Sequence, residues 1–282
     1  MSDALLNRPL LSGVIGYPIG HSLSPAVHGH WLRQLKINAL YMPFEITPED
    51  FPQVLRALPK LGFRGVNITI PHKEAALQHA ESVSDQAALI GAVNTITITN
   101  EGRIHGDNTD AHGFLASLRE AVPEWNAVDC GPIMVIGAGG AARAVIYALI
   151  SDGAEEIHIA NRSRERAEFL KTEFGNRIAV HDLMLIGDII PNVKTIVNTT
   201  ALGMAGKPPL IFPHDALVEN TVVSDLVYTP LGTEFLVRAE EHGCRTVDGL
   251  GMLLHQAAAS FSHWFGTRPA VDEAVRKAAL AA

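Results

Sequence analysis

The chain has 282 residues, of which 47% are hydrophobic and 18% are charged, and its formal net charge is −8. This length and composition are typical of a globular protein with room for two domains. The acidic balance and the lack of a Lys/Arg run argue against nucleic acid as a partner. No apolar run approaches the roughly 18 residues of a membrane helix. The opening sequence MSDALLNRPL lacks the pattern of a signal peptide, so we expect a cytoplasmic protein.

The cysteine and histidine patterns predict neither disulfides nor a metal centre. The two cysteines, Cys130 and Cys244, are expected to be free thiols in a reducing compartment. Of the 13 histidines, His28 and His30 lie two apart on a predicted helix and so point in different directions. No histidine pair has HExxH or similar spacing, so we predict no bound metal.

Short apolar runs alternate with helical patterns along the chain, which is typical of α/β architecture. The first of them predict strands at 11–18 and 39–46, with a helix at 25–35 between them. Thr47, Pro48 and Asp50 then follow in the arrangement of a helix start, namely a cap, a first-turn proline and an early acid.

The segment NITIPHK, residues 67–73, predicts a strand whose hydrogen-bonded ladder ends at Pro71. Side chains alternate across a strand, so Ile68 and Ile70 continue the apolar face begun by Val66. Asn67 and Thr69 lie on the opposite face, and Lys73 follows the proline.

The stretch VNTITIT-NEG-RIHGDN predicts a β-hairpin. If its turn centres on Glu101, antiparallel pairing places Asn94 opposite Asn108. Asp110 then lies close to Asn94, although capping the predicted helix at 111–121 would be its commoner role.

Two further segments carry polar residues with alternative roles. In GYPIGHSLSP, Ser24 and Pro25 form a helix cap and first-turn pair. The hydroxyls of Ser22 and Ser24 beside a helix N-terminus would also suit a carboxylate. Gln256 flanks the apolar stripe of the last predicted helix, where an ordinary boundary residue would be commoner.

A glycine-rich turn predicts a dinucleotide site. Gly137, Gly139 and Ala142 give the GxGxxA spacing after an apolar strand and at the start of a helix. Gly137 permits the tight turn, Gly139 lets a pyrophosphate approach the backbone, and the small Ala142 keeps the helix close to the strand.

The next predicted strand indicates which dinucleotide is bound. It ends in Asn161 rather than in the acid that usually bonds the ribose of NAD. Arg162, Arg164 and Arg166 follow, and a guanidinium suits a 2′-phosphate. We therefore predict NADP, against the alternative of a solvated basic turn.

Eight stretches in a fixed order resemble the shikimate dehydrogenase family, and the resemblance covers nearly the whole chain. They are GYPIGHSLSP, NITIPHK, IGAVNT, GDNTDAHGF, IGAGGAARA, ANRSRER, VNTTALGM and DGLGMLLHQAAASF. The resemblance implies an α/β fold of two domains. An N-terminal substrate-binding and catalytic domain, residues 1–112, would be completed by C-terminal helices at 249–282, and a Rossmann NADP-binding domain would be inserted at 113–248.

The resemblance also implies the site residues. Lys73 and Asp110 match the family's catalytic pair. The substrate-binding matches are Ser22, Ser24, Asn67, Thr69, Asn94, Tyr228 and Gln256. The cofactor-binding matches are Gly137, Ala138, Gly139, Gly140, Ala141, Asn161, Arg162, Ser163, Arg166, Leu226, Gly249 and Asp85. Thr199 and Thr200, at the end of a predicted strand, would border the nicotinamide ribose, and the polar face of NITIPHK would form the floor of a cleft.

The implied reaction is reversible hydride transfer between NADPH and the 3-keto carbon of 3-dehydroshikimate, which gives shikimate. Lys73 would stabilise the developing alkoxide and supply a proton, either directly or through water. Asp110 would hold the lysine ammonium and a ring hydroxyl in place. We expect a monomer or a homodimer with a small-molecule substrate and without a membrane partner.

Three alternatives are open at this point. The nearest is a relative that also oxidises quinate, with NAD or NADP. A different Rossmann dehydrogenase would not need GYPIGHSLSP and NITIPHK together. A ligand-sensing relative without turnover is the third, and the presence of both Lys73 and Asp110 argues against it.

Overall fold

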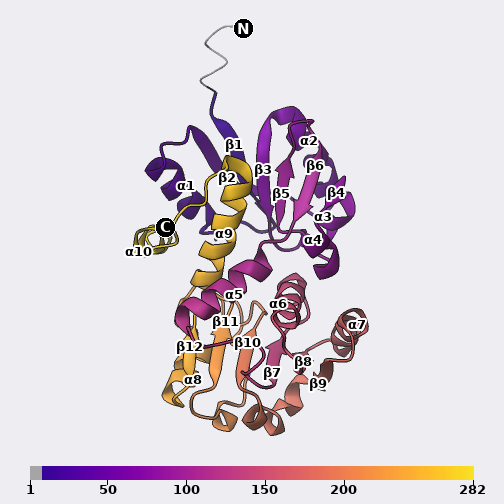
Figure 1. Cartoon of the computed structure of the whole chain (residues 1–282), viewed down its shortest axis with the longest axis vertical. Coiled ribbons are helices and arrows are strands. Elements are labelled where there is room, and N and C mark those ends of the chain that lie inside the picture. Colours follow the sequence, from indigo (N-terminus) through magenta and orange to yellow (C-terminus); the bar gives the residue numbers. More distant parts are fainter. Residues whose placement is uncertain (1–7) are drawn as a thin grey trace. The chain divides into compact units, whose positions relative to one another are not determined.

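The computed structural model describes residues 8–282 and contains two six-stranded sheets (Figure 1). The chain divides into two compact units: unit 1 comprises residues 1–109 and 254–282, and unit 2 comprises residues 110–253. The predicted α/β class, with one unit inserted in the other, is confirmed. The breaks at 109/110 and 253/254 lie a few residues from the expected 112/113 and 248/249. The roles of the two units stay a prediction.

Unit 1 is built on a mixed sheet of order β2-β1-β3-β5-β6-β4. Its strands are β1 (Leu10–Gly16), β2 (Ala39–Glu45), β3 (Phe63–Ile68), β4 (Ser82–Val83), β5 (Thr95–Ile98) and β6 (Ile104–Asp107). Its helices are α1 (Ser24–Gln34), α2 (Phe51–Leu61), α3 (Lys73–His79), α4 (Asp85–Ile90), the later part of α9 (Gly249–Phe265) and α10 (Glu273–Leu280). β1 pairs in parallel with β2 and β3, whereas β5 runs antiparallel to β3 and β6.

The apolar spacing of α2 explains how that helix packs. Phe51, Leu55 and Leu58 recur at helical intervals and are at most 2% exposed. They join a core that includes Val66 and Ile68 of β3. Gly62, with φ of 80°, ends the helix in the left-handed conformation that glycine adopts most easily.

The predicted start of α2 at Pro48 is wrong, because the helix begins at Phe51. Residues 48–50 form a turn instead. In this turn the Phe51 amide donates to the Thr47 carbonyl (3.1 Å), and the Asp50 amide donates to the Thr47 hydroxyl (3.4 Å). Thr47 therefore stabilises the turn that leads into the helix, and Pro52 takes the first-turn position expected of Pro48.

The predicted strand through NITIPHK is also too long. β3 ends at Ile68, and Ile70 is 66% exposed rather than part of the apolar face. Beyond Ile68 the chain bonds to the segment leaving β1, since the Thr69 amide donates to Ile15 O (2.9 Å) and the Tyr17 amide to Ile70 O (3.0 Å). The alternation of side chains holds only inside a strand, so it does not place Ile70.

A cluster of rings packs between α1, β2 and α9 in unit 1. His28 is fully buried, and its ring stacks on Tyr41 with centroids 4.0 Å apart. Trp31, Phe261 and Trp264 surround this pair. Within residues 8–282, neither ring nitrogen of His28 has a hydrogen-bond partner. Burial lowers the pKa of His28 to about 3, an effect that the nearby Asn67 side chain only partly opposes.

Unit 2 is a parallel sheet of order β12-β11-β10-β7-β8-β9. Its strands are β7 (Ile133–Ile136), β8 (Ile157–Asn161), β9 (Ile178–Asp182), β10 (Thr195–Asn198), β11 (Val222–Asp225) and β12 (Arg245–Val247). Its helices are α5 (Asp110–Ala121), α6 (Gly140–Ser151), α7 (Arg164–Phe174), α8 (Glu234–Glu241), the first part of α9, and the short η2 (Leu183–Asp188), η3 (Ile190–Asn192) and η4 (His214–Ala216). This strand order is that of a Rossmann fold, and the order reverses between β7 and β10.

The central strands of unit 2 are buried on both faces. All four residues of β7 and all four of β10 are buried, as expected for parallel strands covered on both sides. One face packs a core that includes Met134, Ile136, Ile186 and Phe235. In a Rossmann sheet the crevice outside the carboxyl ends at the reversal point is the usual ligand site.

Both cysteines are free thiols, as predicted. In the part of the chain from residue 8 to the C-terminus, no helix has the length and apolarity to span a membrane, and no three His, Cys, Asp or Glu side chains are grouped as metal ligands.

Candidate functional site

Polar residues gather where β1 and β3 of unit 1 end. The two strands are parallel neighbours, so their carboxyl ends lie at the same edge of the sheet. The loop with Ser22 and Ser24 follows β1, and Thr69 and Lys73 follow β3. Asn94 precedes the antiparallel strand β5, and its carbonyl accepts from the Ile68 amide (2.7 Å) at the same edge. The structure therefore brings these predicted substrate-binding segments together.

The predicted capping role of Ser24 is wrong. The cap position of α1 is Leu23, no side chain caps the helix, and Ser24 is already its first residue. The Ser24 amide instead donates to the Ser22 hydroxyl (3.3 Å). Ser24 is buried and Ser22 is half-buried. Since α1 does not use the Ser24 side chain as a cap, that side chain is not tied to the helix start, and its role in binding an anion stays a prediction.

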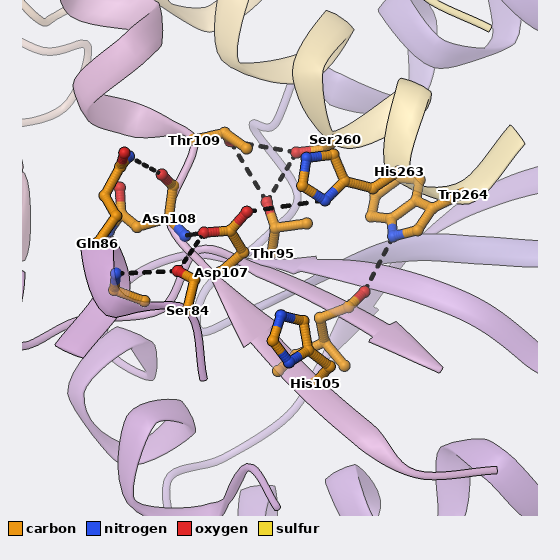
Figure 2. A network of polar contacts seen from close by, with 12 residues as sticks. Ser84, Gln86, Thr95, His105, Asp107, Asn108, Thr109, Ser260, His263 and Trp264 are labelled. Carbon is orange, nitrogen blue, oxygen red and sulfur yellow. Dashed lines mark hydrogen bonds and ion pairs between the residues drawn. The ribbon is translucent and has the colours of Figure 1, made fainter. Parts of the chain in front are cut away.

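Asn67 lies in a buried polar network of unit 1. Its oxygen accepts from the Tyr41 hydroxyl (2.8 Å), and its amide nitrogen donates to the Ser260 hydroxyl (2.9 Å). Ser260 also bonds to Thr95 (2.7 Å) and Thr109 (3.2 Å), as Figure 2 shows. All five side chains are at most 6% exposed. The network joins β2, β3, β5, the end of the hairpin and α9, so it fixes the position of Asn67.

Asn94 is held at the centre of the same network, and its pairing with the hairpin is as predicted. The register Thr95↔Asp107 places Asn94 opposite Asn108. The Asn94 oxygen accepts from the Thr109 amide (2.8 Å), which orients its nitrogen toward the Gln256 oxygen (3.3 Å). Gln256 is 8% exposed and is thus more than a boundary residue.

Asp107 anchors the neighbouring end of the hairpin (Figure 2). One carboxylate oxygen accepts from the Ser84 hydroxyl (2.5 Å) and the Asn108 amide (2.7 Å), and the other lies 3.7 Å from His263. Ser84 also caps α4 by accepting from the Ala87 amide (3.1 Å). The segment that leads to Asp110 is therefore fixed by α4 on one side and α9 on the other.

The predicted catalytic residues open two helices. Lys73 is the half-buried first residue of α3 in unit 1. Asp110 is the first residue of α5 in unit 2, and it is 4% exposed. It follows Thr109, whose amide donates to the Asn94 oxygen. The pairing of Lys73 with Asp110 stays a prediction.

The glycine turn of unit 2 connects β7 to α6, as predicted. Gly137 has φ of 117°, and a Cβ there would lie 2.4 Å from the Thr199 hydroxyl. A Cβ at Gly139 would meet no atom within 4 Å. Gly137 is therefore required by the backbone and by packing, whereas the space above Gly139 is open for a ligand. Gly140 begins α6, and Ala142 is fully buried against the sheet.

A pocket of about 230 Å³ lies beside this turn. It is lined by Ile136, Gly137, Ala160, Asn161, Arg162, Leu183, Thr200 and Leu202. β8 ends at Asn161 as predicted, and the Asn161 amide nitrogen donates to Ser163 O (2.8 Å), which orders the turn before α7. A backbone turn at a helix N-terminus beside a guanidinium suits a phosphate-bearing ligand, so these residues fit a dinucleotide.

The three arginines after Asn161 differ in their surroundings. Arg162 lines the pocket. Arg164 forms an exposed ion pair with Glu168, one turn further along α7 (3.1 Å). Arg166 is exposed on the same helix. Of the three, Arg162 is the one that lines the pocket.

The remaining predicted cofactor residues fall in different places. Thr199 follows β10, and its hydroxyl donates to Ile136 O (2.8 Å) beside the glycine turn. Leu226 follows β11, and a Cβ at Gly249 would lie 2.3 Å from its carbonyl oxygen. Ala138 and Ala141 are half-buried in the glycine turn and α6. Asp85 is exposed on α4 in unit 1 and does not line the pocket of unit 2.

Tyr228, predicted to bind substrate, lies in unit 2, three residues after β11. Burial raises the pKa of its phenol. Its role stays a prediction.

Sequence reasoning missed the partners that hold the site residues. Tyr41, Thr95, Thr109 and Ser260 surround Asn67 and Asn94. A further signal was the polar residue that closes each of the apolar runs TIVN and VVSD. These residues, Asn198 and Asp225, are fully buried in unit 2. Single hydroxyls within apolar segments give no sign of the neighbours that they bond.

Comparison with known proteins gives three family matches in chain order. The model described as "Shikimate dehydrogenase substrate binding domain" matches residues 14–96. "Shikimate / quinate 5-dehydrogenase" matches residues 120–205, and "Shikimate 5'-dehydrogenase C-terminal domain" matches residues 249–280.

Individual proteins are similar over nearly the whole chain. A shikimate dehydrogenase (NADP(+)) of Paracoccus denitrificans (strain Pd 1222) is 53% identical over 271 residues, 96% of each chain. The crystal structure of shikimate 5-dehydrogenase from Thermus thermophilus in complex with NADP(H) and shikimate has a TM-score of 0.86 at 38% identity, covering 96% of this chain and 99% of that one. Quinate dehydrogenase from Corynebacterium glutamicum in complex with NAD has a TM-score of 0.89 at 32% identity, covering 98% and 100%.

Proposed function

Because the chain belongs to the shikimate dehydrogenase family, we propose that it catalyses the reversible NADPH-dependent reduction of 3-dehydroshikimate to shikimate. It is an oxidoreductase that acts on a CH–OH group in the chorismate route to the aromatic amino acids. The observation that carries the cofactor choice is the end of β8. Asn161 stands there in place of an acid, and Arg162 lines the pocket beside the glycine turn.

Unit 1 is the proposed substrate-binding and catalytic domain. Ser22 and Ser24 hold the substrate carboxylate, because two hydroxyls lie beside the start of α1 and that helix does not use Ser24 as a cap. Asn94 and Gln256, oriented by the buried network, bind ring hydroxyls. Asn67, Thr69 and Tyr228 complete the proposed set.

Unit 2 is the proposed NADP-binding domain. The turn 137–141 holds the pyrophosphate against backbone amides, and Arg162 and Arg166 bind the 2′-phosphate together with Asn161 and Ser163. Thr199, Leu226 and Gly249 follow the carboxyl ends of β10, β11 and β12, on one side of the reversal point, and border the nicotinamide end. Asp85 is the least supported member, because it is exposed in unit 1.

The cofactor, when bound, supplies the hydride. The chain's own residues must orient the keto group and manage one proton. Lys73 stabilises the negative charge that develops on the carbonyl oxygen and supplies the proton, directly or through water. Asp110 positions the Lys73 ammonium and a ring hydroxyl.

The test is the oxidation of NADPH, followed by absorbance with 3-dehydroshikimate as substrate, beside parallel assays with quinate and NAD. We expect turnover with shikimate and NADP and a much smaller kcat/KM with quinate and NAD. No turnover with 3-dehydroshikimate by a folded protein would contradict the proposal.

A quinate-oxidising enzyme is the second candidate, favoured by the similarity to a quinate dehydrogenase given above. It would show comparable kcat/KM values for quinate and shikimate in the same assay. If NAD also served as well as NADP in this assay, the proposed role of Arg162 in binding the 2′-phosphate would be contradicted.

We also propose that the enzyme works in the cytoplasm as a monomer or homodimer, with no nucleic acid or membrane partner. The net charge of −8 supports the exclusion of nucleic acid as a partner. Light scattering of the purified protein would decide between one chain and two.

A further inference from the structure

Asp225 is a buried carboxylate that the proposed chemistry does not use. It ends β11 and has no exposed surface. One oxygen accepts from the Asn198 amide nitrogen (2.9 Å) and the Val227 amide (3.0 Å), and the other accepts from the Thr233 hydroxyl (2.7 Å). Burial raises the pKa of Asp225 to about 6, although these three hydrogen bonds oppose the rise. Removing an acid from water is costly, so its presence here calls for a role.

Its partner Asn198 is fully buried at the end of the neighbouring strand β10. An ionised carboxylate only accepts hydrogen bonds, so it must face the nitrogen of the Asn198 amide and never its oxygen. The Asn198 nitrogen also donates to Leu202 O (3.3 Å). Asp225 thereby fixes which way the Asn198 amide points.

The fixed amide in turn shapes the segment that follows β10. With its nitrogen on Asp225, the Asn198 oxygen accepts from both the Thr200 amide (3.0 Å) and the Thr200 hydroxyl (2.8 Å). The Thr200 hydroxyl accepts from the Leu202 amide (3.1 Å). Residues 199–202 are therefore tied to the side chain of Asn198 at several points.

This segment forms part of the proposed cofactor site. Thr200 and Leu202 line the same pocket as Arg162. Thr199 contacts the glycine turn, because its hydroxyl donates to Ile136 O and lies 2.4 Å from where a Cβ at Gly137 would stand. A change in the Asn198 amide would therefore reach the pocket without any direct contact between Asp225 and a ligand.

We infer that Asn198 and Asp225 are positioning residues that hold residues 199–202 in the conformation that binds NADP(H). The inference rests on the proposed function, because it assumes that the pocket of unit 2 takes the cofactor. Neither residue touches the reacting atoms, so their effect is on cofactor affinity.

The test separates positioning from folding with apolar replacements of similar size. Asn198→Leu and Asp225→Leu each leave a buried polar partner unsatisfied, so both are expected to lower the melting temperature and to raise the Kd for NADPH by about 5- to 150-fold. The double variant Asn198→Leu/Asp225→Leu removes both partners. Because the Val227 amide and the Thr233 hydroxyl still lose their acceptor, its melting temperature should stay close to that of Asp225→Leu rather than return to that of the wild type.

The decisive readout is NADPH affinity in the double variant, measured by titration of NADPH fluorescence. Its Kd should stay raised, because Thr200 has lost the amide that held it. The conservative variant Asp225→Asn keeps an oxygen for Asn198 and should lose much less affinity than Asp225→Leu. The KM for shikimate should change little in all variants, and Asp215→Asn, an exposed acid of the same unit, should leave both stability and Kd unchanged.

Wild-type NADPH affinity in the folded double variant would overturn the inference, since the pair would then be merely structural. A folded Asn198→Leu protein with the wild-type Kd for NADPH would also overturn the inference. If the variants that lack Asp225 do not fold, Asn198→Leu still decides the question, because it leaves Asp225 bonded to the Val227 amide and the Thr233 hydroxyl. Wild-type protein that fails to bind NADPH would instead contradict the proposed function.

Discussion

Lys73 occupies a position that depends on both the end of β3 and the start of α3. The chain leaves the sheet at Ile68, and Lys73 then opens the helix. Its backbone is fixed on the hairpin side, because the Val93 amide donates to Lys73 O (2.9 Å). A lysine held at the start of a helix in this way is suited to act on a bound substrate with its side chain while its backbone stays in place.

Replacing Lys73 with alanine should therefore damage turnover more than binding. We expect kcat to fall by about 10²- to 10⁴-fold, the usual range for one acid–base group. The KM for shikimate should change by less than about tenfold, because the other contacts remain. Steady-state kinetics checks both values, with circular dichroism for folding.

The matched control for this experiment is Lys60→Ala, an exposed lysine on α2 of the same unit. It should retain wild-type kinetics. Lys73→Arg should recover little activity, because a guanidinium gives up a proton very reluctantly. Near-normal turnover of folded Lys73→Ala would remove this residue from the chemistry.

Arg162 and Arg164 offer a comparison of two arginines in one turn. Arg162→Ala should weaken NADPH relative to NADH by about 10- to 150-fold, the value of one charge-assisted hydrogen bond. Arg164→Ala should change the NADPH/NADH ratio by less than about threefold, because its exposed pair with Glu168 contributes little. The ratio of kcat/KM values for the two cofactors is the measurement. An equal loss with both cofactors in Arg162→Ala would show that this residue does not recognise the 2′-phosphate.

At the scale of elements, the sequence was most informative inside strands and helices and least at their ends. The hairpin register was predictable, because the turn and the period of two determine pairing. The ends of β3 and the starts of α1 and α2 were not, because backbone hydrogen bonds to segments far along the chain decide them. The bonds between the chain after β3 and the chain after β1 have no signature in NITIPHK itself.

The start of α1 carries a prediction of its own. Changing Ser22 and Ser24 together to alanine should raise the KM for shikimate about tenfold or more, if each hydroxyl bonds the substrate carboxylate. The Kd for NADPH should stay nearly unchanged. The start of α1 should lose only the bond from the Ser24 amide to the Ser22 hydroxyl, because Ser24 itself provides no cap.

Shikimate methyl ester is the informative second substrate for this pair. It lacks the charge that the serines are proposed to bind, so it should discriminate poorly between wild type and the double variant. Ser151→Ala, an exposed residue at the end of α6, is the control. Normal shikimate binding by the double variant would leave this loop without a role in recognition.

At the scale of the whole molecule, the insertion of one α/β unit in another could be anticipated, and the buried polar contacts could not. The alternation of strands and helices and the glycine turn give unit 2 its order. By contrast, Asn67 meets Ser260 across 193 positions of sequence, and Asn198 meets Asp225 across 27. Hydrogen-bonding capacity is the same for a buried and a solvated asparagine, so these pairs become visible only when the strands are placed.

The stability of the fold in acid should depend on His28, a fully buried histidine of unit 1. The pKa of His28 is about 3 in the fold and about 6.5 when unfolded, so the unfolded chain binds the extra proton first. This contribution to stability is fully present above pH 6.5 and is lost as pH falls toward 3, at about 1.4 kcal/mol per pH unit. Between pH 7 and pH 5 the loss from His28 should be about 2 kcal/mol.

The free energies of unfolding of wild type and His28→Phe, measured in urea at pH 7 and pH 5, check this expected loss. Phenylalanine keeps a ring against Tyr41 and cannot be protonated, so the variant should lose less stability on acidification. Asp225, whose pKa is raised, titrates in the opposite direction in both proteins and cancels in the comparison. Equal losses in the two proteins would contradict the assigned role of His28, and His21→Phe, at an exposed site, should behave as wild type.

The contrast between Gly137 and Gly139 bears on how this enzyme could change through mutation. A saturation library scored for folded abundance should be depleted of nearly every substitution at position 137, where a Cβ collides with Thr199. At position 139 the same score should be almost flat, since a Cβ there meets nothing. When the same library is scored for growth without aromatic amino acids, nearly every substitution at either position should be depleted. A lineage released from the need for this reaction would therefore accumulate changes at 139 long before 137, leaving a folded descendant whose turn no longer admits a pyrophosphate.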